Sequence, residues 1–110
     1  MIRQGEIYFA DLNPIKGHEQ SGIRPVLIVQ NDFLNKNLNT VIIAPITTNL
    51  SAKGMLTTFF IDHTSSGLSR DSVALLFQIR TIDKIRLKIK AGKISNQQIT
   101  KIREQLSFVF

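Results

Sequence analysis

The stretch from residue 18 to residue 25, HEQSGIRP, places an imidazole, a carboxylate, an amide and a guanidinium directly before the apolar run Val26–Val29. A guanidinium offers several N–H donors in a fixed fork that matches phosphate oxygens, and a carboxylate can orient it by ion pairing. The same side chains also suit a solvated surface loop. Their place at the lip of an apolar run makes this segment the first candidate for a site.

The other residues that are able to do chemistry are few. His18 and His63 are the only histidines, which leaves a two-histidine acid/base nuclease open as an alternative. Asp62, His63 and Asp71 can be combined into a metal site, but their spacing matches no specific motif and we favour a surface turn. The chain has no cysteine, which excludes disulfides, thiolate metal sites and a cysteine nucleophile. Glycine-rich phosphate loops, HExxH and G-x-S-x-G are also missing, so we expect no metal and no cofactor.

The net charge of +6 is unevenly distributed along the chain. Residues 1–50 carry four basic and four acidic side chains, whereas residues 51–110 carry ten basic and four acidic ones. Six of the ten basic residues fall in one short segment, namely Arg80, Lys84, Arg86, Lys88, Lys90 and Lys93. Such a concentration favours a polyanionic partner, although a solvated lysine-rich surface explains it equally well.

Most of the chain shows the β-branched runs and turn signals that are typical of short strands. The candidate strands are Glu6–Leu12, Pro25–Gln30, Thr40–Ile46, Thr57–Asp62, Ser72–Ile79 and Leu87–Ala91. The last of them alternates apolar and basic residues, which predicts one dry face and one basic face. The asparagine-rich residues 31–39 predict a short helical turn.

One convincing helix is predicted at the C-terminal end. Ser95 and Gln98 fit a capping box, and Ile99, Ile102 and Leu106 recur at helical spacing. Many short strands with one terminal helix predict a mainly β fold, a small bent sheet or barrel. No repeat or linker divides residues 1–110, so we expect a single domain. No apolar run is long enough to span a membrane, and no signal peptide is visible, which predicts a soluble cytoplasmic protein.

Four stretches carry a resemblance to a known family. They are GEIYFADLNP (5–14), GHEQSGIRPVLIVQND (17–32), TVIIAPIT (40–47) and DSVALLFQIRTIDKIRL (71–87). In these motifs and their order, the chain resembles the MazF/PemK family of toxin endoribonucleases from bacterial type II toxin–antitoxin systems. The resemblance implies an SH3-like barrel of the CcdB/PemK-toxin type, with a curved antiparallel sheet and a C-terminal helix. It also implies a homodimer with a groove for single-stranded RNA across its interface, and a cognate antitoxin with a disordered acidic C-terminal tail.

The resemblance assigns the catalytic roles to Arg24, in the R-P-V motif, and to Thr47, at the end of A-P-I-T. In metal-free RNA cleavage the neighbouring 2′-hydroxyl attacks the phosphorus, which gives a 2′,3′-cyclic phosphate and a 5′-hydroxyl end. The protein must then stabilise the charge that grows on the phosphorane oxygens and help to move protons. A guanidinium and a β-branched hydroxyl at a strand end are rigid donors for that charge. The role of Arg24 in proton transfer is implied by the family and not by the ordinary pKa of arginine.

Further substrate contacts are expected around this pair. Glu19 is expected either to orient Arg24 or to accept a hydrogen bond from a base edge, and a solvated loop charge is the alternative. His18 and Gln20 are expected to touch RNA. We also expect Thr48, which follows Thr47 directly, to bind substrate.

The motif before the basic segment supplies the remaining candidates. Gln78 lies beside the groove in the family pattern and is expected to contact a base. Arg80 is expected to contact phosphate, or alternatively to form an ion pair with Asp83. Phe77 occupies a position that is often acidic in the family, so it removes a carboxylate and offers an aromatic ring that can stack on a base.

The apolar and proline residues near the motifs have structural interpretations. Pro25 is expected to fix φ at the start of a strand. Phe33, Leu34 and Leu38 are expected to pack in the core or in a dimer interface.

Two other functions remain open: a non-catalytic gyrase-poisoning toxin like CcdB, and a plain SH3-like binding module. The chain lacks the tryptophan-containing tail of the CcdB proteins, and Arg24 and Thr47 in their motifs disfavour both alternatives.

Overall fold

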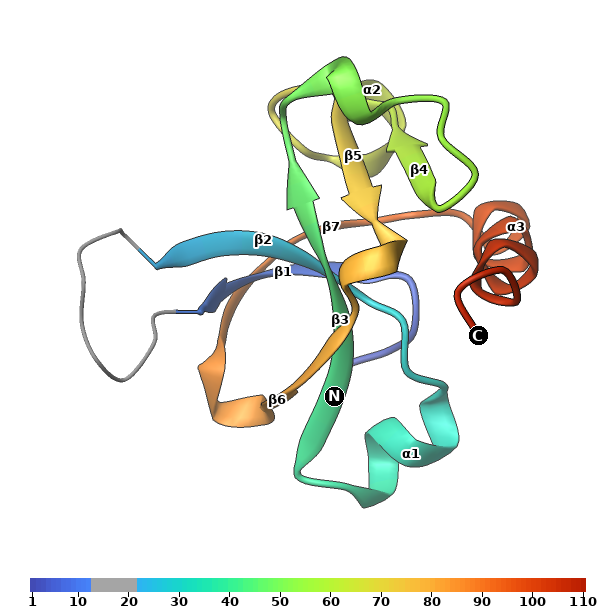
Figure 1. Cartoon of the computed structure of the whole chain (residues 1–110). Helices are drawn as coiled ribbons and strands as arrows, with labels where there is room; N and C mark the ends of the chain where they lie inside the picture. The colour runs from blue at the N-terminus through green and yellow to red at the C-terminus, as the bar shows by residue number, and fades with distance from the viewer. Residues whose placement is uncertain (13–21) are drawn as a thin grey trace.

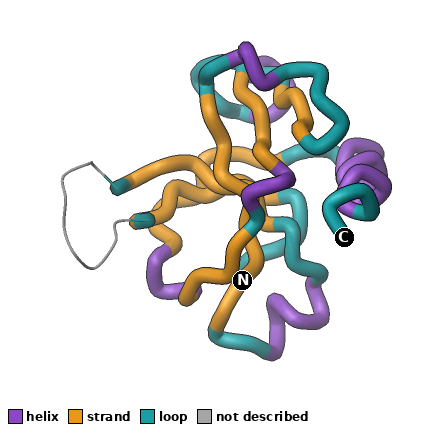
Figure 2. Tube along the Cα trace, viewed as in Figure 1, coloured by secondary structure: helices purple, strands orange, loops and turns teal. Residues whose placement is uncertain are grey.

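The computed structural model describes residues 1–12 and 22–110. Its strands are β1 (Glu6–Asp11), β2 (Ile23–Ile28), β3 (Thr40–Thr47), β4 (Thr58–Ile61), β5 (Ser72–Leu75), β6 (Arg80–Asp83) and β7 (Leu87–Lys93). The helices are α1 (Asp32–Asn37), α2 (His63–Ser66) and α3 (Asn96–Leu106), with single 3-10 turns at η1 (Leu50–Ala52), η2 (Leu76–Gln78) and η3 (Lys84–Arg86). Figure 1 shows the strands crossing at the centre of the molecule, and Figure 2 shows the helices around their periphery.

The strands form one antiparallel, strongly bent sheet in the order β4-β5-β3-β2-β1-β7, with β6 also paired to β3. β3 organises the sheet, because it pairs with β2 on one edge and with two strands in succession on the other. Its first half pairs with β6 and its last two residues pair with β5. In Figure 1, β6 lies beside the lower part of β3 and β5 beside its upper part. The middle of β3 is therefore paired with β2, and its end, Ile46 and Thr47, is held by β5 alone among the described strands.

The sheet buries an apolar cluster on each of its faces, because side chains alternate along every strand. The larger cluster lies against α3 and includes Ile7, Leu27, Ala44, Ile46, Ile61, Ala74, Leu76, Ile94 and Ile102. The second cluster comprises Ala10, Val26, Ile28, Val41, Ile43 and Ile82. Branched aliphatic residues dominate both, which explains why these segments form strands despite their short length.

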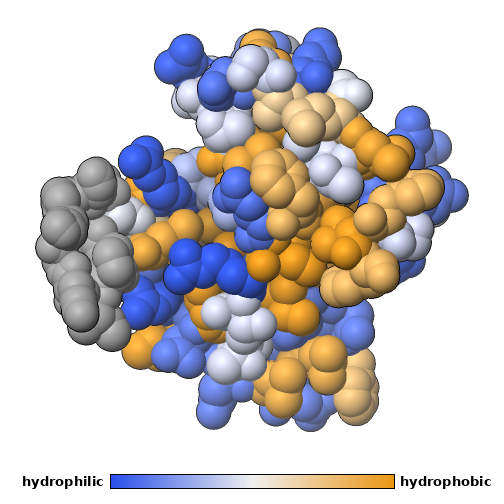
Figure 3. All heavy atoms as spheres, viewed as in Figure 1, coloured by the Kyte–Doolittle hydropathy of each residue, from blue (hydrophilic) through white to orange (hydrophobic). Residues whose placement is uncertain are grey.

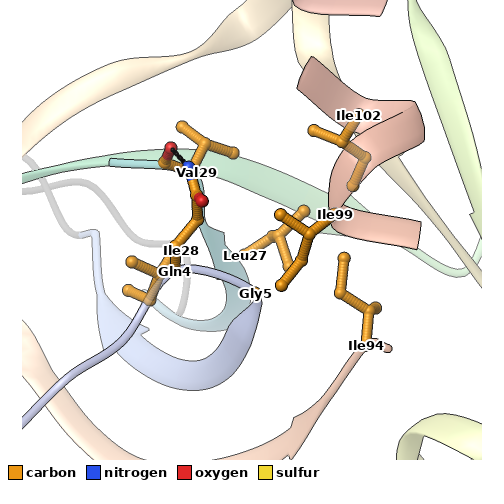
Figure 4. A pocket seen from close by; sticks show the side chains of 8 residues that line it. All are labelled: Gln4, Gly5, Leu27, Ile28, Val29, Ile94, Ile99 and Ile102. Carbon is orange, nitrogen blue, oxygen red and sulfur yellow. Dashed lines mark hydrogen bonds between the residues drawn. The ribbon is translucent and has the colours of Figure 1, made fainter. Parts of the chain in front are cut away.

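α3 closes the larger cluster and begins as predicted. The hydroxyl of Ser95 accepts a bond from the Gln98 N–H, and the Gln98 side chain accepts one from the Ser95 N–H. Figure 4 shows Ile99 and Ile102 of α3 directed towards Gly5 and Leu27, around a void of only about 10 Å³. Gly5 has a φ of +91°, and a Cβ there would lie 2.5 Å from the Ile99 side chain. The packing of α3 thus requires glycine at this position.

The mainly β class with a C-terminal helix is confirmed, and α1 forms within the predicted helical turn. Two predictions were wrong. Residues 72–79 are not one strand: β5 stops at Leu75, the chain turns through η2, and β6 follows. The predicted dry face of β7 is also not dry, because the Ile89 side chain is 72% exposed. A short helix, α2, fills a connection in which the sequence had suggested only a turn.

Two of the apolar residues near α1 are not in the core of this chain. Phe33 is 74% exposed and Leu38 is 41% exposed, whereas Leu34 is half-buried. Pro25 is the third residue of β2 and lies opposite Phe9 of β1, just before the first β2–β3 pair at Val26. The described helices are all too short or too polar to cross a membrane.

Candidate functional site

A surface groove of about 420 Å³ lies between the start of β2 and the end of β3, beyond the last pair that these strands form, Val26 and Pro45. Its lining consists of Leu12, Arg24, Pro25, Pro45, Ile46, Thr47 and Thr48. Among the described residues that line it, Arg24, Thr47 and Thr48 are those with charged or hydroxyl-bearing side chains. Both residues predicted to be catalytic, and the predicted substrate-binding Thr48, therefore meet in one groove among the described residues.

The strand register explains why Arg24 and Thr47 share the groove. Val26 of β2 lies opposite Pro45 of β3. Arg24 stands two residues before Val26 on β2, and Thr47 stands two residues after Pro45 on β3, so both lie beyond this last pair at the same end of it. Because side chains repeat every two residues along a strand, both point to the same face of the sheet. Neither side chain is needed for the core, since Arg24 is exposed and Thr47 is only half-buried.

The Thr47 hydroxyl is oriented by the turn that follows β3. Its oxygen accepts a hydrogen bond of 3.1 Å from the Asn49 N–H, and the Asn49 side chain in turn accepts a bond from the Ser51 N–H at the start of η1. A hydroxyl that accepts on its oxygen can still donate its hydrogen to another group. The arrangement therefore presents a donor at the strand end, as the predicted role of Thr47 would require. Asn49 was not predicted from the sequence; a Thr-x-Asn sequence at a strand end is the available signal.

Arg24 stands near the beginning of β2, opposite Ala10 of β1. β1 and β2 form an antiparallel pair, and next to Asp11 and Ile23 the pair is extended by a hydrogen bond of 2.9 Å from the Leu12 N–H to the Gly22 carbonyl. Ala10 is fully buried, so the backbone opposite Arg24 is anchored in the second core cluster. The guanidinium is thus carried by a paired strand and not by a loop, which suits the phosphate contact predicted for Arg24.

Three predicted contacts, His18, Glu19 and Gln20, lie outside the described residues. They belong to the segment that connects Leu12 with Gly22, and the described chain resumes two residues before Arg24. Their roles stay predictions.

The predicted contacts at Phe77, Gln78 and Arg80 lie on the other edge of β3. Ala74 pairs with Ile46 of β3, and Arg80 pairs with Ile43. The seven residues from Ala74 to Arg80 therefore lie along only four residues of β3, and the extra residues form the turn η2. Leu76 is fully buried and anchors this turn, while Phe77 and Gln78 are exposed.

None of these three residues lines the groove of Arg24 and Thr47. The alternative ion pair between Arg80 and Asp83 is not formed, because the two residues stand three apart in β6 and so point to opposite faces.

Asp62, His63 and Asp71 come together beside α2, with their ligand atoms within 4.8 Å of one another. The contacts among them are those of a surface turn. Asp62 caps α2 by accepting a bond from the Thr64 N–H, and one Asp71 oxygen accepts bonds from both the His63 N–H and the His63 ring at 2.7 Å. The bond to Asp71 raises the pKa of His63, and the same contacts, led by the backbone bond, lower the pKa of Asp71. None of the three residues lines the groove.

The basic segment is divided by its contacts. Lys84 donates to the Asn35 carbonyl, Arg86 to the Asp11 carbonyl at 3.0 Å, and Lys90 to the Glu6 carboxylate at 2.9 Å. These contacts tie η3 and β7 to α1 and β1. Three of the six basic side chains therefore have partners among the described residues, which supports a structural role for them beside any contact with a polyanion.

Comparisons with known proteins agree with this geometry. Residues 3–110 match the family described as the PemK-like, MazF-like toxin of type II toxin–antitoxin systems. Endoribonuclease EndoA of Bacillus subtilis is 44% identical over 106 residues, which cover 96% of this chain and 91% of the relative. Endoribonuclease MazF of Staphylococcus saprophyticus is also 44% identical, over 96% of this chain and 88% of its own.

A solved structure supports the same assignment. Toxin MazF-mt6 of Mycobacterium tuberculosis superposes with a TM-score of 0.76 at 27% identity, over 96% of this chain and 95% of that protein. The family match covers nearly the whole chain, and the two relatives share more than two fifths of their residues with it. The chain therefore belongs to the PemK-like, MazF-like toxins of type II toxin–antitoxin systems.

Proposed function

We propose that this chain is a toxin endoribonuclease that cuts single-stranded RNA in the groove formed by β2 and the end of β3. The observation that carries the proposal is that Arg24 and Thr47, each two residues beyond the last β2–β3 pair at Val26 and Pro45, line one groove. Both relatives at 44% identity are named endoribonucleases. Residues 1–110 would form a single toxin domain that acts on mRNA in the cytoplasm.

The proposed reaction uses the substrate's own 2′-hydroxyl. The 2′-oxygen loses its proton to a base and bonds to phosphorus, while the bond from phosphorus to the 5′-oxygen breaks and that oxygen takes up a proton. The products are a 2′,3′-cyclic phosphate and a 5′-hydroxyl. Arg24 and Thr47 would donate hydrogen bonds to the equatorial phosphorane oxygens, where negative charge grows in the transition state. Thr48 would position the phosphate group next to them.

Substitution of Arg24 tests this assignment. Arg24→Ala should lower the cleavage rate by about 10²-fold or more, on the order of losing one preorganised donor. Arg24→Lys keeps the charge but loses the planar fork, so it should restore only part of the rate. Lys36→Ala, on the exposed side of α1, is the matched control and should cut normally. Normal cleavage by folded Arg24→Ala would place the site elsewhere.

The other partners of the toxin follow from its family. A type II toxin is neutralised by a protein antitoxin. We propose a partner whose disordered acidic tail folds along the surface that carries the basic segment, residues 80–93, and onto segment 18–24. RNA and the tail should then weaken each other's binding, because they share or couple their contacts. A titration with an uncleavable RNA analogue measures this effect. An RNA affinity that saturating antitoxin leaves unchanged would contradict it.

We also propose that the toxin is a homodimer, held by an apolar surface between α1, β3 and α3. Figure 3 shows apolar side chains gathered in this region. Leu34, Ile42, Ile79, Leu106 and Phe110 line a groove of about 210 Å³ there, and Phe110 is 90% exposed. A second copy would cover these residues. Sedimentation should give a dimer for the native chain and a weakened dimer for Phe110→Ser; a native monomer at micromolar concentration would refute the proposal.

A further inference from the structure

Among the described residues, the outer edge of β7 is only partly covered. β7 stands at the end of the strand order and pairs only with β1 among the described strands. Its far end is covered by α2, because a Cβ on Gly92 would lie 2.1 Å from the Ser66 carbonyl oxygen. The backbone from Leu87 to Lys90 therefore presents N–H and C=O groups that no described strand pairs.

Two exposed isoleucines belong to this part of the chain: Ile85 in η3, directly before β7, and Ile89 in β7 itself. Ile85 is 83% exposed and Ile89 is 72% exposed. Lys90 of β7 lies opposite Tyr8 of β1, and Leu87 lies opposite Ala10. Two residues of β7, Lys88 and Ile89, therefore face the single residue Phe9 of β1 and form a β-bulge. Because Ile89 follows the alternation from Lys90, it lies on the same face as Phe9, which is itself 38% exposed. An apolar strip thus accompanies the open edge.

The charge at this edge is positive. Lys90 is bound to Glu6, and Lys84 and Arg86 donate to backbone carbonyls, but Lys88 and Lys93 are exposed. We call the backbone of residues 87–90, with the side chains of Ile85, Lys88, Ile89 and Lys93, the β7 edge surface. It combines unpaired strand backbone, aliphatic side chains and lysines.

We propose that the β7 edge surface binds an extended acidic peptide that has apolar residues at alternate positions and adds to the sheet as a further strand. Main-chain bonds give such a strand its affinity, and the isoleucines and lysines give it a side-chain preference. A second copy of the chain is disfavoured, because lysines would face lysines across the new pair. RNA is disfavoured because isoleucine offers neither a stacking ring nor a hydrogen bond. The antitoxin proposed above is the expected source of the peptide, and in this respect the inference rests on the proposed function.

The test uses the full chain and three probes. The first is a ten-residue synthetic peptide that alternates glutamate and valine, and the second carries lysine in place of glutamate. The third is a single-stranded RNA made uncleavable by 2′-deoxy substitution. Amide NMR shifts locate the binding, and titrations give each Kd for the native chain, for Ile85→Ser/Ile89→Ser, and for the control Phe33→Ser, which changes an equally exposed residue on α1.

The glutamate–valine peptide should shift the amides of residues 87–90, and its Kd should weaken by about tenfold or more in the double variant and not in Phe33→Ser. The lysine peptide should not bind, and the RNA affinity should be the same in all three proteins. Absence of shifts at residues 87–90 in the native chain would overturn the inference. An RNA affinity that falls in parallel with the peptide affinity would overturn it too, and would assign the surface to RNA. RNA cleavage by the native chain, measured on the same samples, tests the proposed ribonuclease function separately.

Discussion

Replacing Thr47 by valine tests the proposed site at a single atom. Valine has the shape of threonine but cannot donate a hydrogen bond, so the variant removes one donor from the groove and leaves its width unchanged. Loss of one preorganised donor costs about 10²- to 10³-fold in kcat, or about 2.7–4 kcal/mol. Because the bond strengthens only as charge grows in the transition state, KM should change little.

The effect of Thr47→Val on folding should be small. The substitution deprives the Asn49 N–H of its 3.1 Å acceptor, but Asn49 is exposed and water can replace the lost partner. The free energy of unfolding should therefore fall by no more than about 1 kcal/mol. Activity should thus fall far more than stability.

Cleavage of a fluorescent RNA under single-turnover conditions measures the rate, and urea denaturation measures stability. Thr47→Ser retains the hydroxyl with a freer rotamer and should lose less than about tenfold. Thr100→Val is the matched control, because Thr100 bonds only within α3 through the Asn96 carbonyl and lies outside the groove. A Thr47→Val protein that cuts at the native rate would refute the proposed role of the hydroxyl.

The remaining predictions concern packing and titration. Gly5→Ala should destabilise the chain by about 1–3 kcal/mol in urea denaturation, because it adds a clash with Ile99 to the cost of positive φ, whereas Gly54→Ala at a φ of +88° has no neighbour within 4 Å and should show the backbone cost alone. Equal losses for both variants would contradict the packing of α3. NMR titration should place the pKa of His63 above 6.5, and Asp71→Asn should return it towards that value, since the carboxylate bond is the main cause of the shift. Because the pKa of His63 is raised in the native chain, the pair stabilises that chain fully below pH 6.5, and the effect is lost as the pH rises through the native pKa. The difference in unfolding free energy between the native chain and Asp71→Asn should therefore shrink as the pH rises through this range. A difference that grows would contradict the pairing.

Local sequence patterns sufficed for the elements whose signals are local. The capping box at Ser95 and Gln98 and the spacing of Ile99, Ile102 and Leu106 predicted the helix α3. The β-branched run Thr40–Ile46 likewise predicted β3, which extends one residue further to Thr47. These signals depend on neighbours in sequence, and tertiary packing did not override them.

Features that depend on long-range pairing were out of reach. The apolar pattern of residues 72–79 continues through η2, and only the pairing of β3 with two partners reveals the break at Leu75. The exposure of Ile89 follows from its place on an outer strand, which alternation alone does not show. Family motifs pointed to Arg24 and Thr47, but the common groove became evident from the β2–β3 register. The support of Thr47 by Asn49 needed the backbone of the following turn.

The central claim, that this chain cleaves RNA through the substrate's own 2′-hydroxyl, is tested most directly by one cleavage assay in excess chelator. Two oligonucleotides are compared that differ only by a single 2′-deoxy sugar at the mapped cut position. The all-ribose strand should be cut, giving a 2′,3′-cyclic phosphate by mass spectrometry, and the substituted strand should remain intact at that position. Cleavage of the deoxy-substituted strand at the same bond, or a strict requirement for a divalent cation, would contradict the account.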